Sequence, residues 1–168
     1  EGRLTFFHDY LRRAVEKRYL ANETKQRSMH LQIADYFQSA VMSAISSEAP
    51  VLVRMASELC YQLQSGGALD RLRESMSSMP LFLALYDGPT QYEVLGYWSA
   101  ICEGSEVADR YSRGLESWSM QDPQERSRGM GRVADLLERL GEWSGAMEIG
   151  RARLAWAKEH DLKSEEAS

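Results

Sequence analysis

The sequence lacks the features that mark several large classes of protein. Its 168 residues include only two cysteines, Cys60 and Cys102, which lie far apart and each inside an apolar pattern. A disulfide scaffold of this length would contain more cysteines, so we expect free, buried thiols and a cytoplasmic location. No stretch approaches the roughly 20 apolar residues that a membrane-spanning helix needs. The chain begins at Glu1 without a start methionine or a signal-type segment, so we expect a piece of a longer polypeptide.

Motifs for catalysis and metal binding are missing as well. There is no GxxxxGK(S/T) loop to bind phosphates, and no apolar run ends in paired carboxylates that would hold magnesium. The three histidines, His8, His30 and His160, are too scattered for a recognisable metal site. No nucleophilic triad is evident. The sequence therefore predicts a chain that is not an enzyme by itself and that holds no metal or cofactor of its own.

The charge balance disfavours a general role in binding nucleic acid. Acidic residues number 25 against 20 basic ones, which gives a net charge of -5 and a pI of about 5.3. Glu16 and Glu23 interrupt the one local basic cluster. We interpret that cluster as a solvated helix face or a contact with an acidic neighbouring domain, and duplex binding by a winged helix is the alternative. The cluster consists of Arg12, Arg13, Lys17, Arg18, Lys25 and Arg27.

What the sequence does contain is helical periodicity. Strand character is confined to RLTFFH at residues 3–8, and Asp9 after it is a plausible helix N-cap. From residue 25 onward, apolar residues recur every three or four positions, which predicts helices with one buried face. SSEAP at 46–50 is the best candidate boundary, and we read LFLALYDGP at 81–89 as a short apolar turn. The expected core stripes include Met29, Ile33, Phe37 and Val41; Leu52, Met55, Leu59 and Leu63; Leu69, Leu72 and Met76; Val94, Trp98 and Ile101; Val107, Tyr111 and Leu115; Met130, Val133 and Leu137; and Trp143, Ala146, Met147 and Leu154.

A repeat of 37 residues underlies these helices. Gly67, Gly104 and Gly141 are spaced at this interval, and each falls between two helical stripes. The spacing predicts a helix-turn-helix unit that occurs about three times, with neighbouring units stacked. An irregular helical bundle is the alternative.

The last unit, VADLLERLGEWSGAMEIGRARL, resembles a tetratricopeptide repeat. Ala134 and Ala146 would let its two helices approach closely, and Gly141 would open the turn between them. Arg153 departs from the small residue usual at its position, which fits a terminal or divergent unit. We interpret the four tryptophans as wedges between helices, and ligand platforms along a concave groove are the alternative. They are Trp98, Trp118, Trp143 and Trp156.

The stretch FFHDYL gives a second resemblance. Phe7, His8 and Asp9 resemble the Met-His-Asp signature that closes the winged-helix domain of STAND ATPases, the NACHT and NB-ARC signalling proteins. The resemblance implies that His8 senses bound ADP through its phosphates in the full-length protein, whereas Asp9 caps and positions the following helix. The alternative is that His8 only bonds a local backbone carbonyl. The resemblance also implies that ADP or ATP, with magnesium, binds to the parent protein and not to this fragment.

Longer stretches, AVEKRYL, RSMHLQIADYF, ELCYQLQSGGALDRLRESMSSMPLFLALY and YEVLGYWSAI, resemble NACHT ATPases of the nephrocystin type. The resemblance implies a mainly α fold, with residues 1–46 ending a winged-helix domain and residues 47–168 forming a tetratricopeptide-like solenoid of stacked antiparallel helix pairs. It implies a regulatory fragment that recognises a protein partner, contacts the ATPase domain of its own chain and joins an oligomer on activation. A free-standing helical adaptor without a nucleotide link is the alternative.

Overall fold

The structure, a computed structural model, describes residues 22–47, 49–102, 104–119 and 122–162, and every regular element in these ranges is an α-helix. The predicted mainly α fold of stacked helices is therefore confirmed. The predicted winged-helix strand and the residues His8 and Asp9 lie outside the described ranges. The helices are α2 (Glu23–Ser46), α3 (Val53–Ser65), α4 (Leu69–Met76), α5 (Met79–Tyr86), α6 (Gln91–Ile101), α7 (Gly104–Ser117), α8 (Pro123–Arg139) and α9 (Trp143–Glu159).

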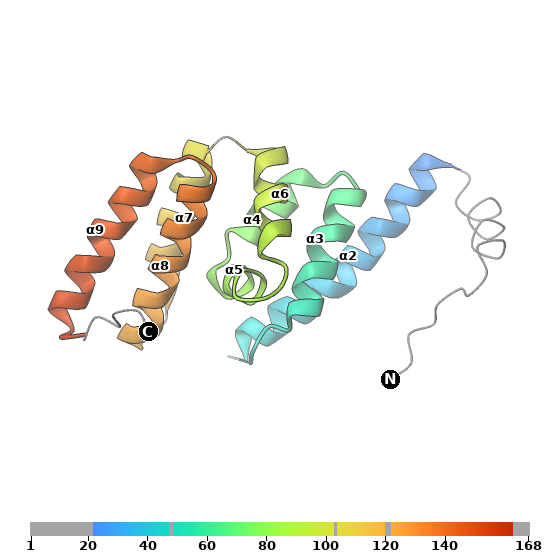
Figure 1. Cartoon of the computed structure of the whole chain (residues 1–168). Coiled ribbons are helices and arrows are strands. Elements are labelled where there is room, and N and C mark those ends of the chain that lie inside the picture. Colours follow the sequence, from blue (N-terminus) through green and yellow to red (C-terminus); the bar gives the residue numbers. More distant parts are fainter. Residues whose placement is uncertain (1–21, 48, 103, 120–121, 163–168) are drawn as a thin grey trace.

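The helices follow one another along an elongated stack, with α2 and α3 at one end and α8 and α9 at the other (Figure 1). Each end is an antiparallel pair. In the first pair His30 on α2 bonds Gln62 on α3, with 2.6 Å between Nδ1 and Oε1. In the last pair Trp156 near the end of α9 donates its indole N–H to the carbonyl of Pro123 at the start of α8, at 3.1 Å.

Helix α5 lies at the centre of the stack, where it contacts α3, α4, α6, α7 and α8. The prediction of a short turn over residues 81–89 is wrong, because residues 79–86 form this helix. Its sequence is almost wholly apolar, and a helix that is apolar on all sides is stable only when neighbours surround it. Pro80 in the first turn suits a helix start, where the missing N–H would have no partner. The buried residues of α5 are Met79, Leu81, Phe82, Leu85 and Tyr86.

A buried hydrogen-bond relay joins three of the middle helices. Trp98 on α6 donates to the hydroxyl of Tyr111 on α7 at 3.1 Å, and that hydroxyl donates to the carbonyl of Met76 at 3.0 Å. Met76 is the last residue of α4. In a longer helix its carbonyl would accept the N–H of the residue four positions later, but that residue is Pro80, which has no N–H. The Phe82 ring of α5 packs 4.7 Å from that of Tyr111, centroid to centroid. The relay therefore satisfies polar groups that burial would otherwise leave without partners.

Two of the three predicted repeat turns are equivalent. Gly67 and Gly141 both adopt the left-handed region, with φ of 74° and 78°. After each glycine the next N–H bonds to the carbonyl five residues earlier, at 2.9 and 2.8 Å. This is the glycine-centred end that many helices adopt. The turns are 74 residues apart, which is two of the predicted 37-residue intervals.

The middle copy departs from this geometry. Gly104 is the first residue of α7, and α6 ends at Ile101, followed by Cys102 in an extended conformation with φ of -145°. The guanidinium of Arg73 replaces the glycine turn, because it donates to the terminal Ile101 carbonyl at 2.6 and 3.1 Å. The repeat therefore has two regular outer turns and an altered junction between them.

The predicted core is correct along α6, α7 and α8, and partly wrong in the two terminal helices. In α3 and α4 it is correct except at the first residue of each stripe, because Leu52 and Leu69 are exposed. Both cysteines are free, with Cys60 buried and Cys102 half-buried. Residues of α2 and α9 that were expected inside are exposed, because each terminal helix is covered on one side only by the part of the chain that the structure describes. These residues are Met29, Ile33, Trp143, Met147 and Leu154.

Candidate functional site

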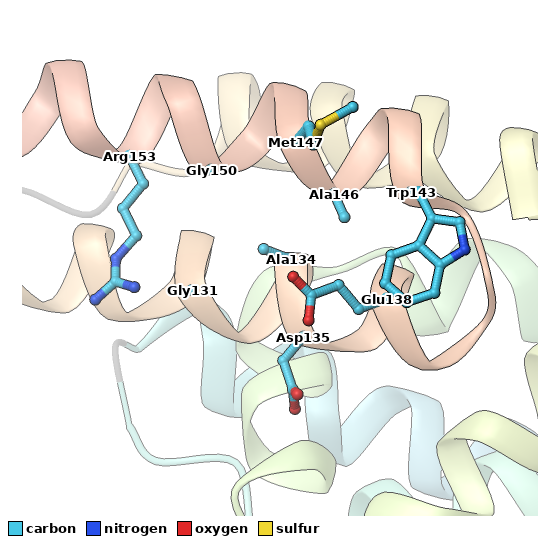
Figure 2. Close-up of a pocket in the computed structure, with 9 residues that line it drawn as sticks. All are labelled: Gly131, Ala134, Asp135, Glu138, Trp143, Ala146, Met147, Gly150 and Arg153. Atoms are coloured by element: carbon cyan, nitrogen blue, oxygen red, sulfur yellow. The ribbon is translucent and has the colours of Figure 1, made fainter. Parts of the chain in front are cut away.

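A groove of about 390 Å³ runs between the last two helices, and we call it the α8/α9 groove (Figure 2). Four of its residues carry no side chain or a single methyl group, so the two backbones themselves form much of its surface. Another hollow borders α2, but one helix alone lines it, and it is open surface. The residues that line the α8/α9 groove are Gly131, Ala134, Asp135, Glu138, Trp143, Ala146, Met147, Gly150 and Arg153.

Local sequence signals fix the two helices that form the groove. Asp122 caps α8 by accepting the Gln124 N–H at 2.9 Å, and Pro123 follows at the first helical position. Glu142 caps α9 by accepting the Gly145 N–H at 3.4 Å. The side of α9 that faces away from the groove packs so closely on α7 that a Cβ at Gly145 would lie 2.7 Å from that of Ala108. These contacts fix where α8 and α9 begin and how α9 packs on α7.

Asp135, on one wall of the groove, already has partners. It accepts hydrogen bonds from the hydroxyl of Tyr86 at 2.7 Å and from Nε of Arg139 at 3.1 Å. Burial, with a further contribution from the bond to Asp135, raises the pKa of Tyr86 to about 12. Asp135 therefore fixes α8 to the end of α5 and is not available to a ligand.

Glu138 and Arg153 are different. Among the described residues, Glu138 has no basic partner and Arg153 has no acidic partner. The exposed Glu138 side chain makes no hydrogen bond there either. Arg153 donates only to the hydroxyl of Ser127, at 3.3 Å. Its guanidinium lies across Gly131, where an added Cβ would be 3.0 Å from one of the terminal nitrogens. Figure 2 shows Glu138 toward the Trp143 end of the groove and Arg153 at the other end.

Trp143 is exposed over 64% of its surface, so its prediction as a wedge between helices is wrong. Trp98 and Trp118 are buried as predicted. Trp156 is half-buried between the guanidinium of Arg126, 5.1 Å from its ring, and the stacked imidazole of His160. The exposed indole of Trp143 forms an apolar edge at one end of the groove, and the side chain of Met147, one turn further along α9, points away from α8 (Figure 2).

Sequence analysis placed tryptophans along a concave groove only as an alternative, and it did not locate the groove between α8 and α9. It noted the unusual Arg153 but not the free Glu138. One usable signal was Gly150, seven residues after Trp143 and thus on the same face of the helix, where a larger side chain would fill the space. That Glu138 and Arg153 have no partner of opposite charge among the described residues could not be predicted, because the pairing of the other charges depends on contacts between helices far apart in the sequence.

The other predicted site residues do not form a centre in the part of the chain that the structure describes. His30 bonds Gln62, and Arg27 of the basic cluster pairs with Glu23 at 2.6 Å. Within those ranges no group of histidine, cysteine or acidic residues is placed to hold a metal ion. None of the helices described there has the length and apolar character of a bilayer span.

Comparisons with family models, with curated proteins and with solved structures found no match to this chain.

Proposed function

We propose that this chain is a partner-binding scaffold whose α8/α9 groove receives a segment of another protein. The observation that carries the proposal is the exposed indole of Trp143 beside an open groove of small residues. Tryptophan is enriched among the residues that contribute most to protein binding, because it buries a large rigid surface. The groove volume of about 390 Å³ lies in the range of known ligand-binding clefts.

We propose further that the scaffold regulates a STAND-type signalling ATPase in the cytoplasm. The support is the resemblance of FFHDYL and of the longer stretches to that family. In this proposal His8 contacts the phosphates of ADP in the parent protein, which supplies the nucleotide site and magnesium. The helices bind the partner and carry out no catalysis. Partner binding then changes the position of the winged helix and withdraws His8.

The groove can be tested with a displayed library of random 12-residue peptides selected on this chain. Gly150→Arg places a long side chain in the groove at a helical position where an added Cβ meets no atom within 4 Å. Gly96→Arg is the matched control, because Gly96 is an exposed glycine of α6 with equally free space. We expect selected peptides to bind the Gly96→Arg chain as they bind the wild type and to bind the Gly150→Arg chain at least tenfold more weakly. Equal binding to both variants, or no selected peptide, would refute the groove as the docking site.

The nucleotide link has a separate test. The gene upstream of Glu1 should encode a phosphate-binding loop, and His8→Ala in the full-length protein should speed the release of labelled ADP. An upstream region without such a loop, or ADP release at the wild-type rate, would leave the chain as an adaptor without a nucleotide link.

A further inference from the structure

We infer that the α8/α9 groove selects an extended segment that carries a basic side chain and, two to four residues away, an acidic one. This inference rests on the proposed function, because it assigns the chemistry of the segment that the groove receives.

One end of the groove suits a cation. The Glu138 carboxylate has no partner among the described residues, and the exposed Trp143 ring lies at the same end (Figure 2). A lysine or arginine side chain there would meet a carboxylate and an aromatic face together. Cations are attracted to tryptophan rings within about 6 Å, and a charge-assisted hydrogen bond to Glu138 would add to that attraction.

The opposite end suits a carboxylate. The guanidinium of Arg153 lies over Gly131, and its hydrogen bond to Ser127 uses Nε. Among the described residues its terminal nitrogens have no hydrogen-bond partner, so they can form two parallel bonds to an acid. Three arginines of α8 differ from Arg153, because each already contacts a carboxylate of this chain. They are Arg128 and Arg132, which pair with Asp87, and Arg139, which pairs with Asp135.

The spacing of the two ends limits the segment. Gly131 and Glu138 are seven residues apart on α8, which corresponds to about 10 Å along the helix. An extended chain advances about 3.3 Å per residue, so charges two to four residues apart reach both ends. Between them Ala134, Ala146 and Gly150 offer an apolar surface that suits a small aliphatic side chain. A helical segment would place only about 6 Å between charges four residues apart.

The experiment repeats the peptide selection on charge variants of the whole chain. The wild type should enrich peptides with Lys or Arg and, two to four positions away, Asp or Glu. Glu138→Lys should abolish the preference for the basic residue and leave the acidic one, and Arg153→Glu should do the reverse. The double variant should enrich the motif with its charges exchanged. Glu148→Lys is the matched control, because Glu148 is exposed on α9 outside the groove, and it should enrich the wild-type motif.

Affinity of the best wild-type peptide, measured by fluorescence anisotropy, gives the second readout. We expect at least a tenfold loss in Glu138→Lys and in Arg153→Glu, and less than a twofold change in Glu148→Lys. The selection could instead enrich peptides that lack the charge pair and that fail to bind the Gly150→Arg chain. That result would overturn this inference and leave the proposed function intact. The absence of any groove-dependent peptide would overturn both. A dimer in sedimentation that Gly150→Arg abolishes would assign the groove to a second copy of the chain instead.

Discussion

Replacement of Tyr111 by phenylalanine tests the central hydrogen-bond relay. The Tyr111 and Trp98 side chains have no exposed surface, so the change leaves the indole N–H and the Met76 carbonyl buried without partners. Each buried group without a partner lowers the free energy of unfolding by about 1–3 kcal/mol. Part of this loss is offset, because the variant has no Tyr111 hydroxyl to desolvate on folding. We therefore expect the free energy of unfolding to fall by about 2–4 kcal/mol, a large share of the roughly 5–15 kcal/mol typical of a domain.

Urea unfolding followed by far-UV circular dichroism measures this loss without relying on Trp98 fluorescence. Tyr86→Phe is the matched control, because it also removes one buried tyrosine hydroxyl, but its partner Asp135 is 37% exposed and keeps its bond to Arg139. We expect the control to cost about 1 kcal/mol or less. Equal losses in the two variants, or a loss below about 0.5 kcal/mol in Tyr111→Phe, would refute the account of the relay.

Three further results are expected. Burial raises the pKa of the Cys60 thiol to about 12, so above pH 9 the unfolded chain loses a proton that the folded chain keeps. The free energy of unfolding should therefore fall with rising pH by about 1.4 kcal/mol per unit from this group, and Cys60→Ala should remove that part of the slope between pH 9 and 11. Gly145→Ala should destabilise the chain by about 1–3 kcal/mol in urea unfolding, because its Cβ would meet that of Ala108 at 2.7 Å, and adding Ala108→Gly should reverse the loss. Arg73→Ala should lower the thermal midpoint, because the Ile101 carbonyl loses its guanidinium partner, and a midpoint unchanged from wild type would show that solvent replaces it.

The helices that sequence analysis predicted best are those with a polar face. A stripe such as Leu59 and Leu63 alternates with exposed residues, and the period identifies both the helix and its buried side. Helix α5 was missed because its residues are apolar throughout and therefore carry no period. Pro80 was the available signal for a helix start there. Spacing alone also could not distinguish Gly104, which begins a helix, from Gly141, which needs a positive φ.

The groove was predictable only in part, for a different reason. The small residues of the last hairpin are visible in the sequence, and so is the unusual Arg153. Which charges remain without partners depends on the pairing of Asp87 and Asp135 with arginines of α8, which the middle helices bring about. The exposure of Trp143 likewise depends on whether another element covers the last helix. Neither property is a local feature of the sequence.

Gly150 makes the surface of the proposed binding groove easy to change. An added methyl group at Gly150 would meet no side chain within 4 Å. A single substitution at such a position alters the depth of the binding surface and leaves the packing beneath it as it was. If the groove binds a partner as proposed, a change of partner therefore needs only one substitution there and no repacking of the core.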